Sequence, residues 1–333
     1  HLVQILGRRA QVKEGNMKKY VLKRLLIAIP TFLGITLFVF TLCYFATGSP
    51  LELLLSDPNI SEAEVARRAE ELGLNDPFHE QYFTWMKNML SGNLGVSYRT
   101  GNPVSGMLMD ALWPTLLLVL ASVLVACLIS FPLGIQSARH QNGIWDNISA
   151  VFSFLSTSTP SFFLGLVFLS IFSVHLGILP IGGMYDTGKS ETMLSLLRHL
   201  IMPACVLGST MVGSLVQYIR SSMLEVMGED YVRTARSKGL KELVVITKHV
   251  LRNSLIPVVT YLGMEIPLLM GGAIVTEQVF SWPGLGSLML KSINSRDYST
   301  IMGVTIITAV AVMVFNLLTD LLYGVLDPRI RHN

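Results

Sequence analysis

The feature that most constrains this 333-residue sequence is a series of six apolar stretches. Each is about as long as the roughly 20 helical residues that are needed to cross the hydrocarbon core of a bilayer. Only 14% of the residues are charged, well below the roughly one quarter that is typical of soluble domains. The sequence therefore predicts an all-α polytopic membrane protein, with spans near residues 25–46, 113–137, 148–174, 200–219, 254–276 and 301–325.

The amino-terminal region divides at Met17. Residues 1–16 are polar and without pattern, and we expect them to be an extraneous or disordered leader. A cleaved signal peptide is the alternative for the first span, but the apolar run exceeds the usual signal-peptide core of about 7–15 residues. We expect the first span and an extracytoplasmic region in 17–105, a core of five spans in 106–328, and a cytoplasmic tail in 329–333.

Lysine and arginine residues gather before the first span and between the fourth and fifth spans. Because basic loops favour the cytoplasmic side, this distribution predicts that both chain ends lie in the cytoplasm. The acidic segment between the first two spans then lies outside. Within it, Ser61 and Glu64 have the spacing of a capping box, which predicts a short helix over 62–72 that ends at Gly73.

A segment between the third and fourth spans imitates a phosphate-binding loop. Its sequence GMYDTGKS matches G-x-x-x-x-G-K-[ST] through Gly183, Gly188, Lys189 and Ser190. A working site of this kind follows a buried strand and opens a helix in a nucleotide-binding domain. This copy occupies a short loop on the predicted outer side. We interpret the match as coincidental and expect no ATP to bind to this chain.

Other patterns of catalysis or metal binding are missing from the sequence. Cys43, Cys127 and Cys205 lie in apolar runs without the spacing of a disulfide framework or a metal site. The histidines form no H-E-x-x-H motif, and no nucleophile elbow is present. We expect no metal, no cofactor and no nucleic acid partner. A membrane-bound enzyme and a passive channel stay as alternatives to a coupled transport protein.

The loop between the fourth and fifth spans carries the most specific pattern. Its sequence, SSMLEVMGEDYVRTARSKGLKELVVITKHVLRNSLIP, has too many charges to face lipid. It predicts an amphipathic helix to about Ser237, a left-handed turn at Gly239, and a second short helix from about Lys241. Such a helix suits docking into the groove of a partner, or alternatively binding to anionic headgroups. The expected apolar anchors are Leu240, Val244 and Ile246, with Lys241, Glu242 and Lys248 toward water.

The same loop resembles the EAA loop of permease subunits of bacterial ATP-binding-cassette (ABC) importers. The resemblance rests on EDYVRTARSKG at 229–239, followed by His249, Leu251, Arg252, Asn253 and Pro257. The first acidic-alanine-alanine triplet of that motif is not literal, because Arg233 and Thr234 precede Ala235. From Met17 onward the chain resembles the B-type permeases of dipeptide, oligopeptide and nickel importers. This wider resemblance rests on ELGLNDPFHEQYFTW at 71–85, GNLGVSYRTGNPV at 92–104, TEQVFSWPGLG at 276–286 and LDPRIR at 326–331.

The resemblance implies a type I ABC importer (MetI-like) permease fold in the cytoplasmic membrane of a bacterium or archaeon. The implied partners are a second homologous permease subunit in a heterodimer, two cytoplasmic ABC ATPase subunits, an extracytoplasmic solute-binding protein and membrane lipid. ATP and Mg²⁺ would bind to the ATPases, and the short helix of the loop would dock in an ATPase cleft. The residues implied in coupling are Glu229, Tyr231, Arg233, Ala235, Arg236, Lys238, Gly239, Leu240, His249, Arg252, Asn253 and Pro257.

Acidic residues in the last two spans form a second set of candidates. Glu265 is near the middle of the fifth span, and a charge at this depth indicates a transport pathway or an interhelical hydrogen bond. Asp320 is expected to snorkel or pair near the inner interface. After the fifth span, a tight turn is expected to lead into a short surface helix, which in the family caps the outer side of the pathway. The predicted outer-gate residues are Glu277, Trp282, Pro283, Gly284 and Gly286.

The substrate is the least constrained part of the prediction, because selectivity in these importers resides largely in the separate binding protein. We predict di- or oligopeptides, with nickel or another small solute as the alternative. Peptides are favoured because no cluster of His or Met suited to a soft metal lines a predicted span.

Overall fold

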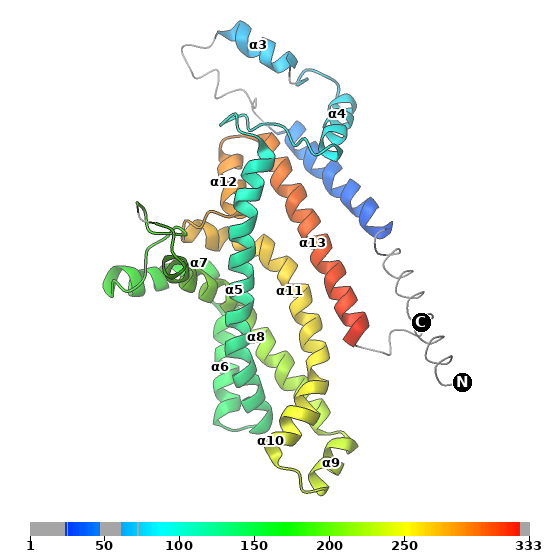
Figure 1. Ribbon diagram of the computed structural model, residues 1–333, viewed down its shortest axis with the longest axis vertical. Coiled ribbons are helices and arrows are strands. Elements are labelled where there is room, and N and C mark those ends of the chain that lie inside the picture. The colour runs from blue at the N-terminus through cyan, green and yellow to red at the C-terminus, as the bar shows by residue number, and fades with distance from the viewer. Residues whose placement is uncertain (1–23, 25, 47–60, 72, 189, 327–333) are drawn as a thin grey trace, which may run out of the picture. The chain divides into compact units, whose positions relative to one another are not determined.

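The computed structural model describes residues 24, 26–46, 61–71, 73–188 and 190–326, and it is mostly helical there (Figure 1). An isolated bridge between Val96 and Pro103 is the one β contact among these residues. The chain packs as two compact units. Unit 1 comprises the described residues up to Pro114 and Pro283–Met313, and unit 2 comprises those of Thr115–Trp282 and those from Val314 onward. The predicted leader and tail lie outside the described residues.

Five described helices are long and apolar enough to cross a membrane. Each contains all or most of a predicted span, so those five predictions are confirmed. The helices are Leu26–Tyr44, α5 (Val104–Arg139), α8 (Met193–Met227), α11 (Arg252–Val279) and α13 (Tyr298–Leu326).

The third predicted span is not a single helix. Residues 148–174 divide between α6 (Ile144–Ser158) and α7 (Ser161–Phe168), which continues as the π-helix η1 (Leu169–His175). The two parts are bent by 103° (Figure 1). Pro160 causes the break, because it has no backbone N–H and holds the preceding Thr159 in the extended region at φ −92° and ψ 120°. The third predicted span is therefore broken at Pro160 into two bent helices.

Helix α8 is the central helix of unit 2 and is buried along most of its length. It approaches its neighbours closely through glycine. A Cβ atom on Gly208 would lie 2.6 Å from the Ser122 carbonyl oxygen of α5, and one on Gly213 would lie 2.7 Å from the Ser153 carbonyl oxygen of α6. Small residues at such contacts allow the dense packing on which helix association in membranes depends.

The acidic segment of unit 1 contains α3 (Glu62–Glu71) and α4 (Phe78–Leu90). The Glu64 backbone N–H donates to Ser61 Oγ at 3.2 Å, as expected at the start of a capping box. Gly73 has φ 65° after the end of α3, which is the left-handed conformation typical of a helix C-terminus. The predicted short helix is confirmed to Glu71, and Leu72 lies outside the described residues.

Apolar contacts hold unit 1 together in two places. Val104 and Leu108 of α5 pack with Val304 of α13 and with Leu285, the first residue of α12 (Leu285–Asn294). A cluster of aromatic rings joins the helix Leu26–Tyr44 to α4, with Phe40 at its centre. The other rings of the cluster are Tyr44, Phe78, Tyr82 and Trp85.

Asp297, just before α13, is a buried carboxylate that sequence reasoning missed. It is only 2% exposed. It accepts hydrogen bonds from Ser97 Oγ at 2.5 Å, the Tyr98 backbone N–H at 3.0 Å and Thr300 Oγ1 at 2.8 Å. These bonds anchor the 91–103 segment to the start of α13, 200 residues away in the chain.

We predict that Asp297→Ala destabilises the protein. The substitution removes a charged acceptor from several buried donors, and a hydrogen bond to a charged group contributes about 1.5–3 kcal/mol. Thermal unfolding of the detergent-solubilised protein should show a lower midpoint. Asp110→Ala, at an exposed position of α5, is the matched control and should leave the midpoint unchanged. Equal midpoints for the two variants would contradict this role of Asp297.

Candidate coupling loop

The loop that follows α8 folds as two short helices around a glycine turn. Helix α9 (Asp230–Ser237) begins after Gly228, and α10 (Glu242–Val244) follows Lys241. Between them Gly239 has φ 74°, and its backbone N–H donates to the Arg236 carbonyl oxygen at 2.9 Å. The predicted helix, left-handed turn and second helix are confirmed.

An ion pair crosses the glycine turn. Arg236 Nη2 lies 2.9 Å from Glu242 Oε1, and Arg236 Nε donates to Glu242 Oε2 at 3.3 Å. The two bonds form a bidentate contact, which fixes orientation more strongly than a single bond does. Both side chains are about half exposed, so the pair acts mainly by setting the direction of α10 relative to α9. Arg236 was predicted as a coupling residue, and Glu242 was not predicted as its partner.

The inner side of the loop is closely packed. Val232 and Ala235 of α9 are buried, and so are Val245, Ile246 and Val250 of the π-helix η2 (Val245–Leu251). Helix α9, η2 and α8 are in contact with one another. The loop is therefore a folded unit attached to the end of α8, with Ala235 at a site of close packing. Ile246 was predicted as an outward anchor, and its burial corrects that prediction.

The outer side of α10 is apolar and open. Leu243 is 68% exposed, Leu240 is 41% exposed and Val244 is 38% exposed. Leu240 and Val244 were predicted as anchors, whereas Leu243, the most exposed of the three, was missed. Three exposed aliphatic side chains on one short segment form a patch with no cover among the described residues, and we call this set the α10 patch.

A second contact ties the loop to the start of α11. Asn253 Nδ2 donates to the Tyr231 hydroxyl at 3.1 Å and to the His249 carbonyl oxygen at 2.8 Å. Tyr231, His249 and Asn253 were all predicted as coupling residues, and the structure brings them together. Tyr231 remains 42% exposed.

The remaining predicted coupling residues lie on the surface. Glu229 is the residue before α9 and its side chain makes no capping bond. Arg233 lies 3.7 Å from Asp230 on an exposed face. The other exposed residues of the set are Lys238, Arg252 and Pro257, the last of these inside α11.

The predicted outer-gate residues fall into two groups. In unit 2, Glu277 is fully buried inside α11 and accepts a hydrogen bond from Thr115 Oγ1 of α5 at 2.6 Å. Trp282 is buried as well, and its backbone N–H donates to the Glu277 carbonyl oxygen at 2.8 Å. In unit 1, Pro283 is exposed, while Gly284 and Gly286 are buried at the start of α12. The turn and the short helix are confirmed, but Glu277 lies in a helix and not in a loop.

Glu265 and Asp320 are both half-buried, on α11 and α13 respectively. Glu265 is within electrostatic range of the Tyr261 hydroxyl, one turn earlier on α11. The Tyr261 ring stacks on Tyr218 of α8 at 4.6 Å between centroids. Polar and aromatic groups therefore meet where α8 and α11 lie together.

The segment GMYDTGKS at 183–190, which matches the phosphate-loop pattern, lacks the preceding strand and the directly following helix of a nucleotide-binding site among the described residues. Among the described residues the π-helix η1 precedes it, not a strand, and α8 begins only at Met193. The Gly183 backbone N–H donates to the Phe280 carbonyl oxygen at 2.9 Å, which ties this loop to the end of α11. Lys189, the residue that would contact a phosphate, lies outside the described residues.

Residues 130–332 match the family described as binding-protein-dependent transport system inner membrane component. Residues 17–119 match the N-terminal region of the same group of membrane components. The chain belongs to this family. It is a multi-pass permease subunit of an ABC importer in the cytoplasmic membrane, and not an enzyme. Such a permease operates with an ATPase and a solute-binding protein.

Curated relatives match the permease along nearly its whole length. The oligopeptide transport system permease protein AppB of Bacillus subtilis (strain 168) is 44% identical over 95% of this chain and 100% of its own. The dipeptide transport system permease protein DppB of Escherichia coli (strain K12) is 36% identical over 95% of this chain and 99% of its own.

Solved structures agree on the fold. Two inward-facing structures of the MetNI methionine ABC transporter match with TM-scores of 0.54 and 0.52. Each match covers 66% of this permease and 96% of the other chain, at 16% and 15% sequence identity. The permease therefore has the type I importer (MetI-like) fold.

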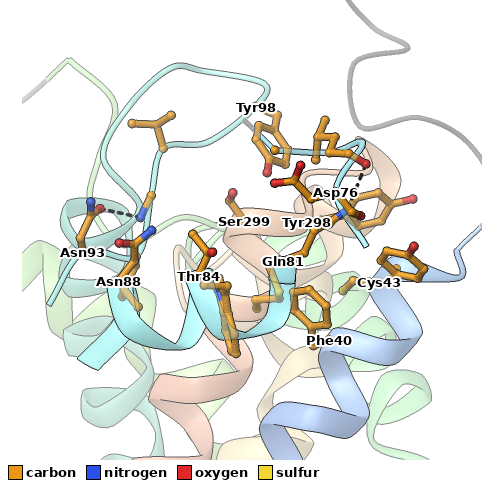
Figure 2. Close-up of a pocket in the computed structure, with 18 of the residues that line it drawn as sticks. Phe40, Cys43, Asp76, Gln81, Thr84, Asn88, Asn93, Tyr98, Tyr298 and Ser299 are labelled. Carbon is orange, nitrogen blue, oxygen red and sulfur yellow. Dashed lines mark hydrogen bonds between the residues drawn. The ribbon is translucent and has the colours of Figure 1, made fainter. Parts of the chain in front are cut away.

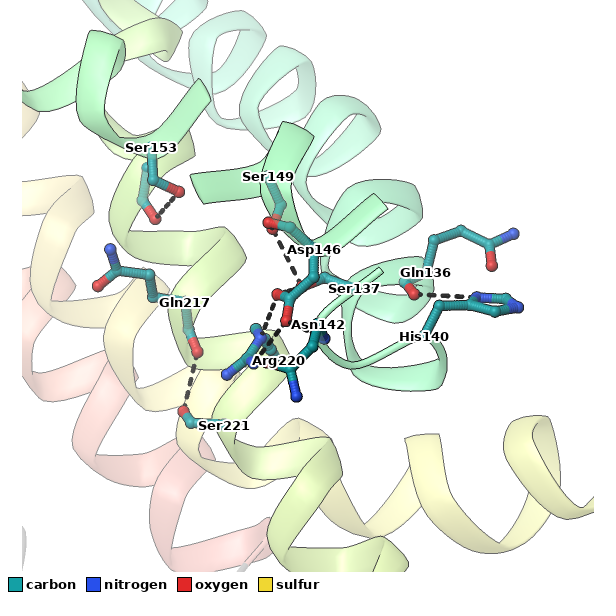
Figure 3. Close-up of polar contacts among 11 residues, drawn as sticks. Gln136, Ser137, His140, Asn142, Asp146, Ser149, Ser153, Gln217, Arg220 and Ser221 are labelled. Carbon is teal, nitrogen blue, oxygen red and sulfur yellow. Dashed lines mark hydrogen bonds and ion pairs between the residues drawn. The ribbon is translucent and has the colours of Figure 1, made fainter. Parts of the chain in front are cut away.

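Figure 3 shows a polar cluster that was not predicted, and one of its members, Arg220, shortly precedes the loop 229–257 in sequence. Arg220, near the end of α8, binds Asp146 of α6 through two bonds, Nε to Oδ1 at 2.7 Å and Nη2 to Oδ2 at 2.9 Å. Asp146 also accepts from Ser137 Oγ of α5 at 2.5 Å and from the Asn142 backbone N–H at 2.9 Å. One carboxylate thus joins α5, α6 and α8, and we call this set the Asp146 node.

Proposed function

We propose that this permease imports di- or oligopeptides and forms half of the translocation pathway with a second, homologous permease subunit. In this proposal the loop 229–257 docks on a cytoplasmic ATPase subunit, which binds ATP and Mg²⁺, and both chain ends lie in the cytoplasm. The basic residues around α9 and before the first span support that orientation. Closure of the ATPases on ATP then moves the loop and, through it, the spans.

The observation that carries the docking role is the α10 patch. Short segments exposed to water seldom present three exposed aliphatic side chains within residues 240–244, because exposed apolar surface is unfavourable without a partner. The patch sits on a rigid support, since the Arg236–Glu242 pair and the buried side of η2 fix its direction. A helix that offers apolar anchors in this way suits a hydrophobic groove. Its polar surroundings, including Lys238 and Arg252, fit the rim of such an interface.

We expect Leu243→Glu to prevent stable binding of the ATPase subunits. The substitution places a carboxylate at the centre of the α10 patch, where docking would bury it without a partner. Binding should weaken by about tenfold or more, measured by co-purification of the ATPase with the membrane-extracted permease. Leu243→Met keeps the apolar character and is the matched control. Unchanged co-purification of the Glu variant would rule out the α10 patch as the docking surface.

The names of the curated relatives support peptides as the substrate class, because the Bacillus subtilis and Escherichia coli relatives are named for oligopeptide and dipeptide transport. The full complex in proteoliposomes, supplied with its binding protein, should accumulate labelled di- or tripeptides when ATP is enclosed. Accumulation of ⁶³Ni²⁺ in place of peptide would favour the nickel alternative and contradict the substrate proposal.

We further propose that Glu265 lines the pathway and that the turn before α12 contributes to its outer gate. The cluster of Glu265 with Tyr261 and Tyr218 supports the first point, since polar groups at this depth of a span face a cavity or another helix. For the gate, Pro283 offers the exposed surface. Glu277 and Trp282 are buried and would support the turn indirectly. The bond of Glu277 to Thr115 and the bond of the Trp282 backbone N–H to the Glu277 carbonyl oxygen would fix the end of α11 that precedes the turn.

A further inference from the structure

Unit 1 contains a pocket of about 680 Å³ that none of the roles above uses (Figure 2). It lies among the end of the helix Leu26–Tyr44, helix α4, the 93–98 segment and the start of α13. Ligand pockets in proteins commonly measure about 300–1,000 Å³, so this space is large enough for a small peptide. In the proposed orientation it lies on the outer side, from which solute arrives.

The walls of the pocket are aromatic and polar and are held in place by neighbouring contacts. Phe40 and Trp85 lie 5.6 Å apart between ring centroids. Asn93 Oδ1 accepts a hydrogen bond from the Gly95 backbone N–H at 3.0 Å. The Tyr98 backbone N–H donates to Asp297 Oδ1 at 3.0 Å, which fixes the backbone at this position. Burial raises the pKa of the Tyr98 phenol above its ordinary value. The aromatic lining consists of Phe40, Tyr44, Trp85, Tyr98 and Tyr298.

Among the described residues that line the pocket, Asp76 is the one with a formal charge. Gln81 Nε2 donates to the carbonyl oxygens of Asp76 at 2.8 Å and Leu74 at 3.0 Å, which fixes the loop before α4. The Asp76 carboxylate lies over Gly73, where a Cβ atom would be only 2.8 Å from Oδ2. Within the described part of the chain Asp76 has no ion pair.

This combination of groups selects a cation. A pocket that combines the carboxylate of the exposed Asp76 with five aromatic rings in its lining attracts an ammonium group by charge and offers it cation–π interaction. A ligand carboxylate, by contrast, would meet no basic side chain in the described lining. Asn88 and Asn93, which lie with Thr84 on the side away from Asp76 in Figure 2, offer amide donors and acceptors of the kind that pair with a peptide backbone.

We propose that this pocket binds the amino end of a short peptide, with the α-ammonium group at Asp76 and the first peptide groups at Asn88 and Asn93. The assignment rests on the proposed function and adds to it a subsite in the permease itself, distinct from the solute-binding protein. Its aromatic walls accept side chains of varied size, and Asp76 requires a free amino terminus.

Cys43, which lines the pocket, is a native reporter for this proposal. In a permease carrying Cys127→Ala and Cys205→Ala, Cys43 is the sole thiol. The rate of its labelling by a maleimide is measured in the assembled complex in nanodiscs, with and without trialanine. We expect trialanine to slow the labelling and N-acetyl-trialanine to leave it unchanged.

Asp76→Asn should raise the trialanine concentration for half-protection by about tenfold, as the loss of one charge-assisted hydrogen bond predicts. Asp110→Asn is the control and should not.

Equal protection by the acetylated peptide, or protection that is unaffected by Asp76→Asn, would overturn the assignment. The other ligand that could bring an ammonium group to Asp76 is the lipid phosphatidylethanolamine. Slower labelling in nanodiscs that contain this lipid than in nanodiscs of phosphatidylglycerol alone, with no effect of trialanine in either, would likewise overturn the peptide assignment.

Uptake of trialanine by the same complex separates the pocket assignment from the proposed function. Uptake without protection would overturn the pocket assignment alone, and no uptake of any peptide would overturn the proposed function.

Discussion

Gly239→Val should uncouple the permease from its ATPase without preventing membrane insertion. Gly239 has φ 74°, and a Cβ atom there would meet nothing within 4 Å. The effect of valine is therefore conformational and not steric. The left-handed region costs a residue with a Cβ roughly 1–2 kcal/mol, and more when the side chain is β-branched. A change of this size shifts the population of the correct turn by about 5–30-fold.

The measurement is the ATPase activity of the assembled complex with and without loaded binding protein. Wild-type complex should be stimulated, and the Gly239→Val complex should lose most of the stimulation or fail to assemble. Gly239→Asn is the matched control, because asparagine adopts the left-handed conformation more readily than other residues with a Cβ. It should retain most of the coupling. Equal stimulation of the valine variant and the wild type would show that the turn does not transmit the motion.

Asp146→Asn should destabilise the part of unit 2 where α5, α6 and α8 meet, and it should weaken coupling as well. The substitution keeps the size of the side chain but removes the charge that Arg220 and Ser137 contact. Because Arg220 is about one third exposed, the loss is smaller than for a fully buried pair, about 2 kcal/mol. The thermal unfolding midpoint in detergent should fall, and binding-protein stimulation of ATP hydrolysis should fall with it.

A double-mutant cycle separates the ion pair from the other contacts of the Asp146 node. Arg220→Gln alone should also destabilise the protein, and the double variant should be no less stable than the worse of the two single variants. Strict additivity of the two losses would mean that the two side chains contribute independently and that the Asp146 node is not a connection between α6 and α8.

The fold of the loop 229–257 was predictable because its signals are local. The spacing of charges, the glycine at 239 and the change of pattern after it lie within a few residues of one another. The glycine takes the conformation that the sequence indicates, and two helices form on either side. The loop's internal ion pair was missed because Arg236 and Glu242 are joined across a turn, where helical periodicity no longer says which residues face each other.

Long-range partners could not be predicted in the same way. Asp146 and Arg220 are 74 residues apart, and Ser97 and Asp297 are 200 apart. Nothing in the spacing of either pair links them before the helices pack. The bend at Pro160 did have a local signal, the restriction that a proline places on the residue before it. The apolar composition on both sides of Thr159 concealed that signal, because hydropathy alone does not distinguish one straight span from two bent helices.

In the proposed mechanism, ATP-driven transport by this permease runs through the loop 229–257. It is tested most directly by uptake of labelled trialanine into proteoliposomes that contain the complete complex, binding protein and enclosed ATP. We expect uptake above the external concentration for the wild type and the Gly239→Asn variant, and none for Gly239→Val or when ATP is omitted. Uptake by the Gly239→Val complex at the wild-type rate, or uptake without ATP, would contradict it.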